Sequence, residues 1–168
     1  MSLIKVTEIL DQAASAQATL SLPFELRQKS RLRAKLDSGD EVGLMLPRGH
    51  VLRGGDYLKA DNGMIIQLAA ADEAVSTVTA PDTLTLQRAC YHLGNRHVPL
   101  QITDHWIRYL EDHVLDDMVI SLGLNVTHEQ APFEPETGAY HSQGHSHHHS
   151  HSHDHNHDEN HDHSHSHS

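Results

Sequence analysis

The sequence predicts an α+β protein with an all-β N-terminal domain, a second domain of alternating strands and helices, and a histidine-rich tail. Short apolar runs broken by turn residues fill residues 1–72, and helical periodicity appears only within residues 73–140. Residues 141–168 contain no apolar side chain. Because these residues have no apolar surface to bury, they cannot offset the entropy cost of folding. We therefore expect a disordered tail after two small domains.

The first domain is expected to be a small antiparallel sandwich or barrel, because short strands with frequent turns are typical of those folds. Strand candidates, chosen for apolar content or alternating polarity, lie at residues 3–9, 31–36, 41–46 and 64–68. Clusters of turn residues lie at residues 37–40, 47–49, 54–56 and 60–63. The first of these clusters joins two strand candidates into a hairpin.

The second domain is expected to follow the order β-α-β-β-α-β. Pro81-Asp82-Thr83 provides helix-start chemistry, and Gly94 and Gly123 are expected to end the two helices. The predicted elements are strands at residues 73–79, 98–102, 106–110 and 125–129, and helices at residues 84–93 and 112–122. This order is that of a ferredoxin-like domain.

Charge and cysteine content exclude several classes of protein. The net charge of −11 makes nucleic acid and anionic membranes poor partners. The single cysteine, Cys90, excludes an intramolecular disulfide and any multi-thiolate metal site within one chain. Its position in the middle of a predicted helix favours a structural thiol over a nucleophile. Without a signal peptide or a membrane-length apolar run, we expect a cytoplasmic protein.

The tail holds 13 of the 19 histidines, mostly spaced His-x-His by small polar residues. Neutral imidazole binds Ni(II), Zn(II), Cu(II) and Co(II), so the tail is a candidate metal-binding segment of low selectivity. Purification tags are usually short and uninterrupted, whereas this tract is long and irregular. The candidate ligands of the tail are His141, His145, His147, His148, His149, His151, His153, His155, His157, His161, His163, His165 and His167.

Two histidines outside the tail are candidate metal ligands. His97 follows Gly94-Asn-Arg96, on a short turn after a predicted helix, where side chains are often exposed. One imidazole cannot hold a metal tightly, so further ligands would come from the tail or from a second copy of the chain. His113 and Asp117 share one helix face and are either a weak second site or an ordinary polar face.

The sequence carries no enzyme signature. It contains no nucleophile elbow, phosphate-binding loop, zinc-protease motif or dinucleotide fingerprint. A metal-dependent hydrolase would need a fixed three-ligand site with a neighbouring base. We therefore expect a protein that is not an enzyme.

Several strings in both halves of the sequence resemble the UreE family of urease accessory proteins, which are nickel metallochaperones. Gly94-Asn-Arg-His97, and Pro132-Phe-Glu-Pro-Glu136 followed by Gly138-Ala-Tyr140, are the most specific. The others are Lys29-Ser-Arg-Leu-Arg33, Gly43-Leu-Met-Leu-Pro-Arg-Gly49, Leu52-Arg-Gly-Gly-Asp56, Ala89-Cys-Tyr-His92, Val98-Pro-Leu-Gln101 and His113-Val-Leu-Asp-Asp117.

The resemblance implies a homodimer that donates Ni(II) to the urease apoprotein together with an accessory GTPase complex. It implies a peptide-binding-like first domain, a ferredoxin-like second domain, and nickel bound by His97 jointly with its symmetry mate. It also implies a peripheral His-x-His site, whose second histidine is His113 but whose first position is Glu111 here. The tail would capture or store nickel. The alternative is a general divalent-metal buffer or storage protein without a delivery role.

Overall fold

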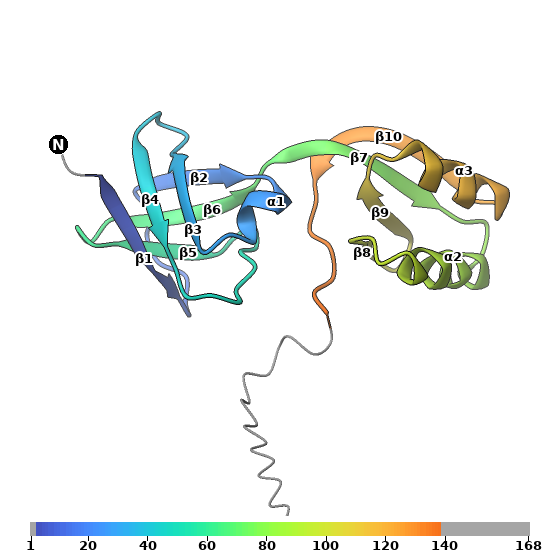
Figure 1. Cartoon of the computed structure of the whole chain (residues 1–168), viewed down its shortest axis with the longest axis horizontal. Coiled ribbons are helices and arrows are strands. Elements are labelled where there is room, and N and C mark those ends of the chain that lie inside the picture. Colours follow the sequence, from blue (N-terminus) through green and yellow to red (C-terminus); the bar gives the residue numbers. More distant parts are fainter. Residues whose placement is uncertain (1–2, 139–168) are drawn as a thin grey trace, which may run out of the picture.

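The computed structural model describes residues 3–138 of the chain (Figure 1). Residues 1–2 and 139–168 lie outside the described residues. The predictions for the tail, including its thirteen candidate histidine ligands, therefore fall outside the described part.

The N-terminal half is a six-stranded sheet that curls into a barrel-like shape (Figure 1). Its elements are β1 (Ile4–Leu10), β2 (Ala18–Leu22), the one-turn helix α1 (Phe24–Arg27), β3 (Arg31–Lys35), β4 (Glu41–Met45), β5 (Tyr57–Ala60) and β6 (Ile65–Ala70). The strand order is β2-β6-β5-β1-β4-β3. The predicted hairpin is confirmed, since β3 and β4 pair antiparallel.

The strand directions correct one expectation. The sheet is not purely antiparallel, because β1 pairs parallel with β4 and β2 pairs parallel with β6. Parallel pairs need a long connection, and nothing in the local sequence indicates which distant strand will be the partner. The strands β2 and β5 and the helix α1 also lie in regions for which no element was predicted. Alternating burial along β6, where Ile66 and Leu68 point inward, fills the core that these strands enclose.

The C-terminal half confirms the ferredoxin-like prediction. Its elements are β7 (Asp72–Thr79), α2 (Thr83–Asn95), β8 (Gln101–Ile102), β9 (Trp106–Leu110), α3 (His113–Ser121) and β10 (Asn125–Pro132). The four strands form one antiparallel sheet in the order β10-β7-β9-β8. Both helices contribute to one core over this sheet, in which Leu86 and Leu93 of α2 and Leu115 and Val119 of α3 are buried.

In this half, three element boundaries differ from the predictions by two residues or more. The helix α2 runs through Gly94 to Asn95, because the left-handed residue that ends it is His97 instead. The strand β8 is only two residues long, since Pro99 has no N–H to donate to a sheet. The strand β10 extends to Pro132 and pairs with β7 over its full length.

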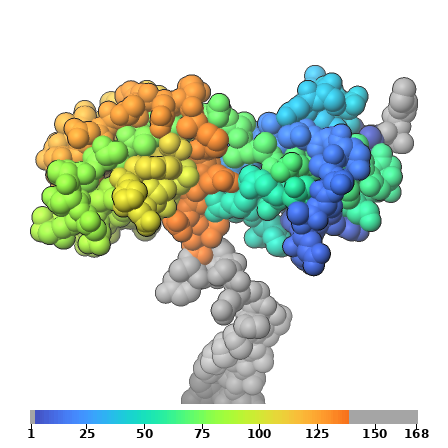
Figure 2. All heavy atoms as spheres, turned by 180° about the vertical axis from the view of Figure 1, so that it is seen from behind, coloured from blue at the N-terminus to red at the C-terminus, as the bar shows by residue number. Residues whose placement is uncertain are grey.

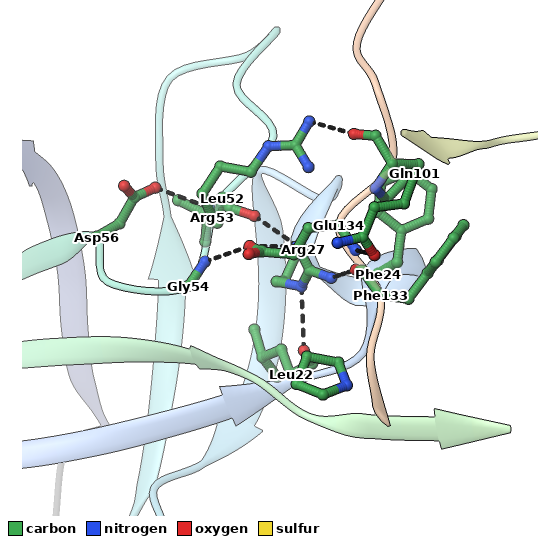
Figure 3. Close-up of polar contacts among 12 residues, drawn as sticks. Leu22, Phe24, Arg27, Leu52, Arg53, Gly54, Asp56, Gln101, Phe133 and Glu134 are labelled. Carbon is green, nitrogen blue, oxygen red and sulfur yellow. Dashed lines mark hydrogen bonds and ion pairs between the residues drawn. The ribbon is translucent and has the colours of Figure 1, made fainter. Parts of the chain in front are cut away.

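After β10, residues 133–136 turn back between the two halves, and we call this segment the strap (Figure 2). The fully buried side chain of Arg27 binds the strap through hydrogen bonds (Figure 3). Its Nε and Nη1 donate to the carbonyl oxygens of Leu22 and Leu52, both at 3.1 Å, and its Nη2 donates to the carbonyl oxygen of Phe133. One guanidinium group therefore joins three separate stretches of chain.

The strap also contacts both halves through its own polar groups. Glu134 accepts from the N–H of Gly54 at 2.6 Å, and Arg53 donates to the carbonyl oxygen of Pro135 at 2.6 Å (Figure 3). On the other side, the N–H of Glu134 donates to the side chain of Gln101, and the N–H of Glu136 donates to the carbonyl oxygen of Leu100. The strap thus fixes the β unit against the ferredoxin-like unit.

Arg27→Met should lower the free energy of unfolding by about 3 kcal/mol or more, because it removes three buried hydrogen bonds and leaves the carbonyl groups of Leu52 and Phe133 without a donor. Urea unfolding followed by circular dichroism measures the loss. Arg33→Met is the matched control, because Arg33 is 71% exposed and pairs with Glu41 at the surface. That substitution should cost at most about 1 kcal/mol. Equal losses in the two variants would contradict the role given to Arg27.

Candidate metal-binding site

His97 lies at the C-terminal end of α2, where the structure places it on the surface, as predicted. The helix begins at the N-cap Asp82, whose carboxylate accepts from the N–H of Thr85 at 2.7 Å. Leu86 and Leu93 anchor its inner face in the core. The C-cap is Arg96, and the N–H of His97 then donates to the carbonyl oxygen of Gly94 at 3.0 Å. A rigid helix therefore positions the His97 backbone.

The backbone of His97 is left-handed, with φ of 57°. Among residues 3–138, it is the one residue other than glycine with a positive φ. This position after a helix is usually glycine or asparagine, because a β-carbon costs about 1–2 kcal/mol there. Strain of this kind is often retained at functional positions. The conformation is an independent reason, beyond the sequence motif, to regard His97 as functional.

A single chain does not complete a metal site around His97. Within the described residues, no group of three or more His, Cys, Asp or Glu side chains could hold a metal ion. His97 can therefore contribute one exposed imidazole, and the other ligands would come from a second chain or from residues beyond 138. A site shared at His97 therefore stays a prediction.

His113 is the first residue of α3 and is exposed, next to the N-cap Asp112. It lines a surface hollow of about 310 Å³. The other residues lining the hollow are Asp116, Asp117, Ile120, Val126 and His128. The two acidic residues differ, because Asp117 is exposed and Asp116 is turned inward and buried. This helix face is thus not a uniform polar surface.

Asp116 lies at the centre of a hydrogen-bonded network that sequence reasoning missed. Tyr109 donates to its Oδ1 at 2.6 Å, and the Nε2 of His128 lies 2.7 Å from its Oδ2. On the other side of the imidazole ring, Nδ1 of His128 lies 3.6 Å from Oε1 of Glu111. His128 is in β10, and only the packing of β10 beside α3 brings these residues together. No spacing in the sequence indicates that contact.

The network shifts the pKa values of its members. Burial alone would raise the pKa of Asp116, but hydrogen bonds, chiefly from Tyr109, outweigh that effect and lower it. The hydrogen bond to Asp116, followed by the charge of Glu111, raises the pKa of His128. Burial and the contact with Asp116 also raise the pKa of Tyr109. The carboxylate of Asp116 is therefore ionised and accepts two hydrogen bonds.

The other histidines of the folded part, apart from His128, and the single cysteine lie outside this network. His50, His92 and His105 are exposed, and His92 stacks edge-on against Tyr91. Cys90 is half-buried, and burial raises the pKa of its thiol, which agrees with a structural role. None of the helices in residues 3–138 has the length and apolar content needed to cross a membrane.

Comparison with known proteins identifies the family. A family model described as "UreE urease accessory protein, C-terminal domain" matches residues 73–168, and one described as "UreE urease accessory protein, N-terminal domain" matches residues 6–71. The chain belongs to the UreE family of urease accessory proteins. The family resemblance drawn from the sequence motifs is confirmed, and the family name describes an accessory protein rather than an enzyme.

Individual members of the family are similar over most of the chain. The urease accessory protein UreE of Alkalilimnicola ehrlichii is 64% identical over 138 residues, which are 82% of this chain and 85% of that protein. Those of an Enterobacter species and of Pseudomonas putida are each 55% identical over 141 residues, or 83% of this chain. These matches cover 93% and 88% of the two relatives.

Asp116→Asn should change the free energy of unfolding in a pH-dependent way. Because its pKa is lowered in the fold, the Asp116 carboxylate stabilises the protein at pH values above its ordinary pKa of 3.8. This contribution is lost as the pH falls through the lowered pKa. Because its pKa is raised in the fold, protonated His128 stabilises the protein at pH values below its ordinary pKa of 6.5. That contribution is lost as the pH rises through the raised pKa. The difference between wild type and variant should therefore be largest near about pH 5.

Urea unfolding of both proteins at about pH 2.5, 5 and 9 measures this difference. Asp117→Asn, which changes an exposed carboxylate on the same helix, is the control and should have a smaller effect at each pH. An effect of Asp116→Asn that does not vary with pH would contradict the network.

Proposed function

We propose that this protein is a metallochaperone that donates Ni(II) to apo-urease during assembly of the urease metallocentre. Membership of the UreE family supports a role in urease maturation. The observation that carries the nickel assignment is His97, an imidazole held exposed in a strained backbone conformation at the end of a rigid helix. Nickel is a good match to imidazole nitrogen, as are Zn(II), Cu(II) and Co(II).

We place the nickel ion between two copies of His97 in a homodimer. A single exposed imidazole is a weak ligand, and a two-fold axis near it would supply a second one to the same ion. An exposed site with few protein ligands allows the ligand exchange that delivery requires. Urease apoprotein and an accessory GTPase complex are the proposed partners, and the cytoplasm the proposed compartment.

The histidine-rich tail is proposed to capture metal for delivery. Its 13 histidines would raise the local concentration of nickel near His97, because both belong to the same chain. We retain the division into domains at residues 1–72 and 73–140. Separate buried cores on the two sides of that boundary support it. The proposed peripheral site pairs Glu111 with His113 as a mixed carboxylate–imidazole site, because Glu111 stands where the family resemblance implies a histidine.

The alternative function is a buffer or store of divalent metal with no delivery role. The concentration of histidines in the tail favours it. In that case the tail carries all of the metal binding, and the folded domains carry none.

His97→Gly should abolish tight nickel binding without destabilising the fold. In a chain truncated after Tyr140, calorimetry should find one tight nickel ion per dimer for the wild type and none for the variant. The free energy of unfolding should stay within about 1 kcal/mol of wild type, because glycine adopts the left-handed region freely. His97→Ala should lose binding equally, and His105→Ala, a change at another exposed histidine, should keep it. Tight binding in the His97 variants would contradict the assignment.

Removal of residues 141–168 separates delivery from buffering. In cells with limiting nickel, a chaperone that delivers through His97 should still support urease activity without the tail, at a reduced level. A full-length His97→Ala chain should support less activity than the tail-less chain. The opposite order, with activity lost with the tail and retained without His97, would favour the buffer.

A further inference from the structure

We propose a second metal site in the ferredoxin-like unit, formed by His128 and Glu111, that binds a divalent ion of borderline hardness such as Zn(II), Co(II) or Ni(II). His128 comes from β10, and Glu111 lies just before α3. The site borders the surface hollow described above, which His128 and His113 both line. It does not rest on nickel delivery, and it uses no ligand of the His97 site.

The first argument is the orientation of the His128 ring. The ionised Asp116 accepts through Oδ2 from Nε2 of His128, and through Oδ1 from Tyr109. The proton of a neutral His128 is therefore on Nε2, and the lone pair is on Nδ1. A metal-binding imidazole usually donates its other N–H to a carboxylate, and that carboxylate is in turn held by a further hydrogen bond. The carboxylate fixes the orientation of the ring and increases the basicity of the imidazole.

The second argument is the distance on the outer side of the ring. Nδ1 of His128 lies 3.6 Å from Oε1 of Glu111. This is too long for a hydrogen bond. It is close to the separation of about 3.4 Å between two ligand atoms that share a tetrahedral ion at about 2.1 Å from each. A divalent ion between the two atoms would satisfy both.

The third argument is access and charge. The side chains of His128 and Glu111 are 51% and 45% exposed, whereas that of Asp116 behind them is only 10% exposed. An ion from solvent can therefore reach the outer pair, and the carboxylate of Asp117 on the same hollow adds negative charge that attracts cations. The supporting residues Tyr109 and Asp116 are buried, whereas the side chains of His128 and Glu111 are partly exposed.

The number of ligands sets the character of the site. Asp116 supports the ring from behind, so two ligand atoms of residues 3–138 face the ion, in agreement with the absence of a three-residue cluster in that part of the chain. Water completes the coordination. Binding is therefore weaker than at a four-ligand structural site, and the ion exchanges readily. This pair differs from the Glu111–His113 pair that the family resemblance implies, because its imidazole comes from a strand and not from the helix.

The test uses the full-length chain with the 13 tail histidines changed to serine, to remove competing sites. Co(II) is titrated while the methyl signals of Val126 and Ile120, which line the same hollow, are followed by NMR. Saturable paramagnetic shifts of both signals are the expected result. His128→Gln and Glu111→Gln should abolish them, whereas His105→Gln, at an exposed histidine outside the hollow, should leave them unchanged.

Asp116→Asn tests the support behind the ring and should weaken Co(II) binding by about 10–100-fold. If Asp116→Asn does not fold, Tyr109→Phe is the milder second variant. Fluorescence of the single tryptophan, Trp106, reports folding of this unit. Methyl shifts that persist in His128→Gln would overturn the proposal and assign the ion to His113 and Asp117. Methyl signals that do not respond to Co(II) in the folded parent chain would also overturn it, and leave the His128 contacts as an ion pair only.

Discussion

The buried guanidinium of Arg27 is the interaction on which the arrangement of the molecule depends. It donates to carbonyl groups from β2, from the loop before β5 and from the strap. The carbonyl oxygen of Leu22 also accepts from the N–H of Ala71, whereas Arg27 is the one donor found among the described residues for those of Leu52 and Phe133. Burial of those two carbonyl groups without a donor would oppose formation of the junction. Glu134, 3.6 Å from the guanidinium, compensates its charge. Phe133 then packs edge-on against Phe24, and this aromatic contact closes the junction between the two halves.

Local patterns predicted the parts of the fold that depend on local chemistry. Alternating polarity and turn residues identified the β3–β4 hairpin, and caps and periodicity gave the β-α-β-β-α-β order. The parallel pairing of β2 with β6 was not predictable in this way, because Ala18 and Ile66 are far apart in the chain. Arg27 gave no signal either, since a single arginine in a polar stretch is ordinarily a surface residue.

The two candidate metal sites also differ in how far the sequence alone could predict them. His97 was identifiable because its motif is contiguous and follows a helix end, although the left-handed conformation became evident only in the structure. His128 was not identifiable, because its partners Asp116 and Glu111 come from another element, and the packing of β10 against α3 decides the contact. Sequence reasoning therefore found a candidate ligand positioned by one element and missed a cluster assembled from several.

The chain crosses between its two halves twice, and this has a consequence for dissecting it. β6 ends at Ala70 and β7 begins at Asp72, so the first crossing is almost direct; the second is the strap. A fragment that stops at the boundary between the family domains would contain Phe24 and Arg27 but lack Phe133, whose ring packs against Phe24 and whose carbonyl oxygen accepts from Arg27. An isolated N-terminal half would thus expose more of the Phe24 ring and leave the guanidinium of Arg27 without one of its three acceptors. Binding of hydrophobic peptides by such a fragment would reflect its own missing segment, so peptide binding by this half has to be measured with the strap present.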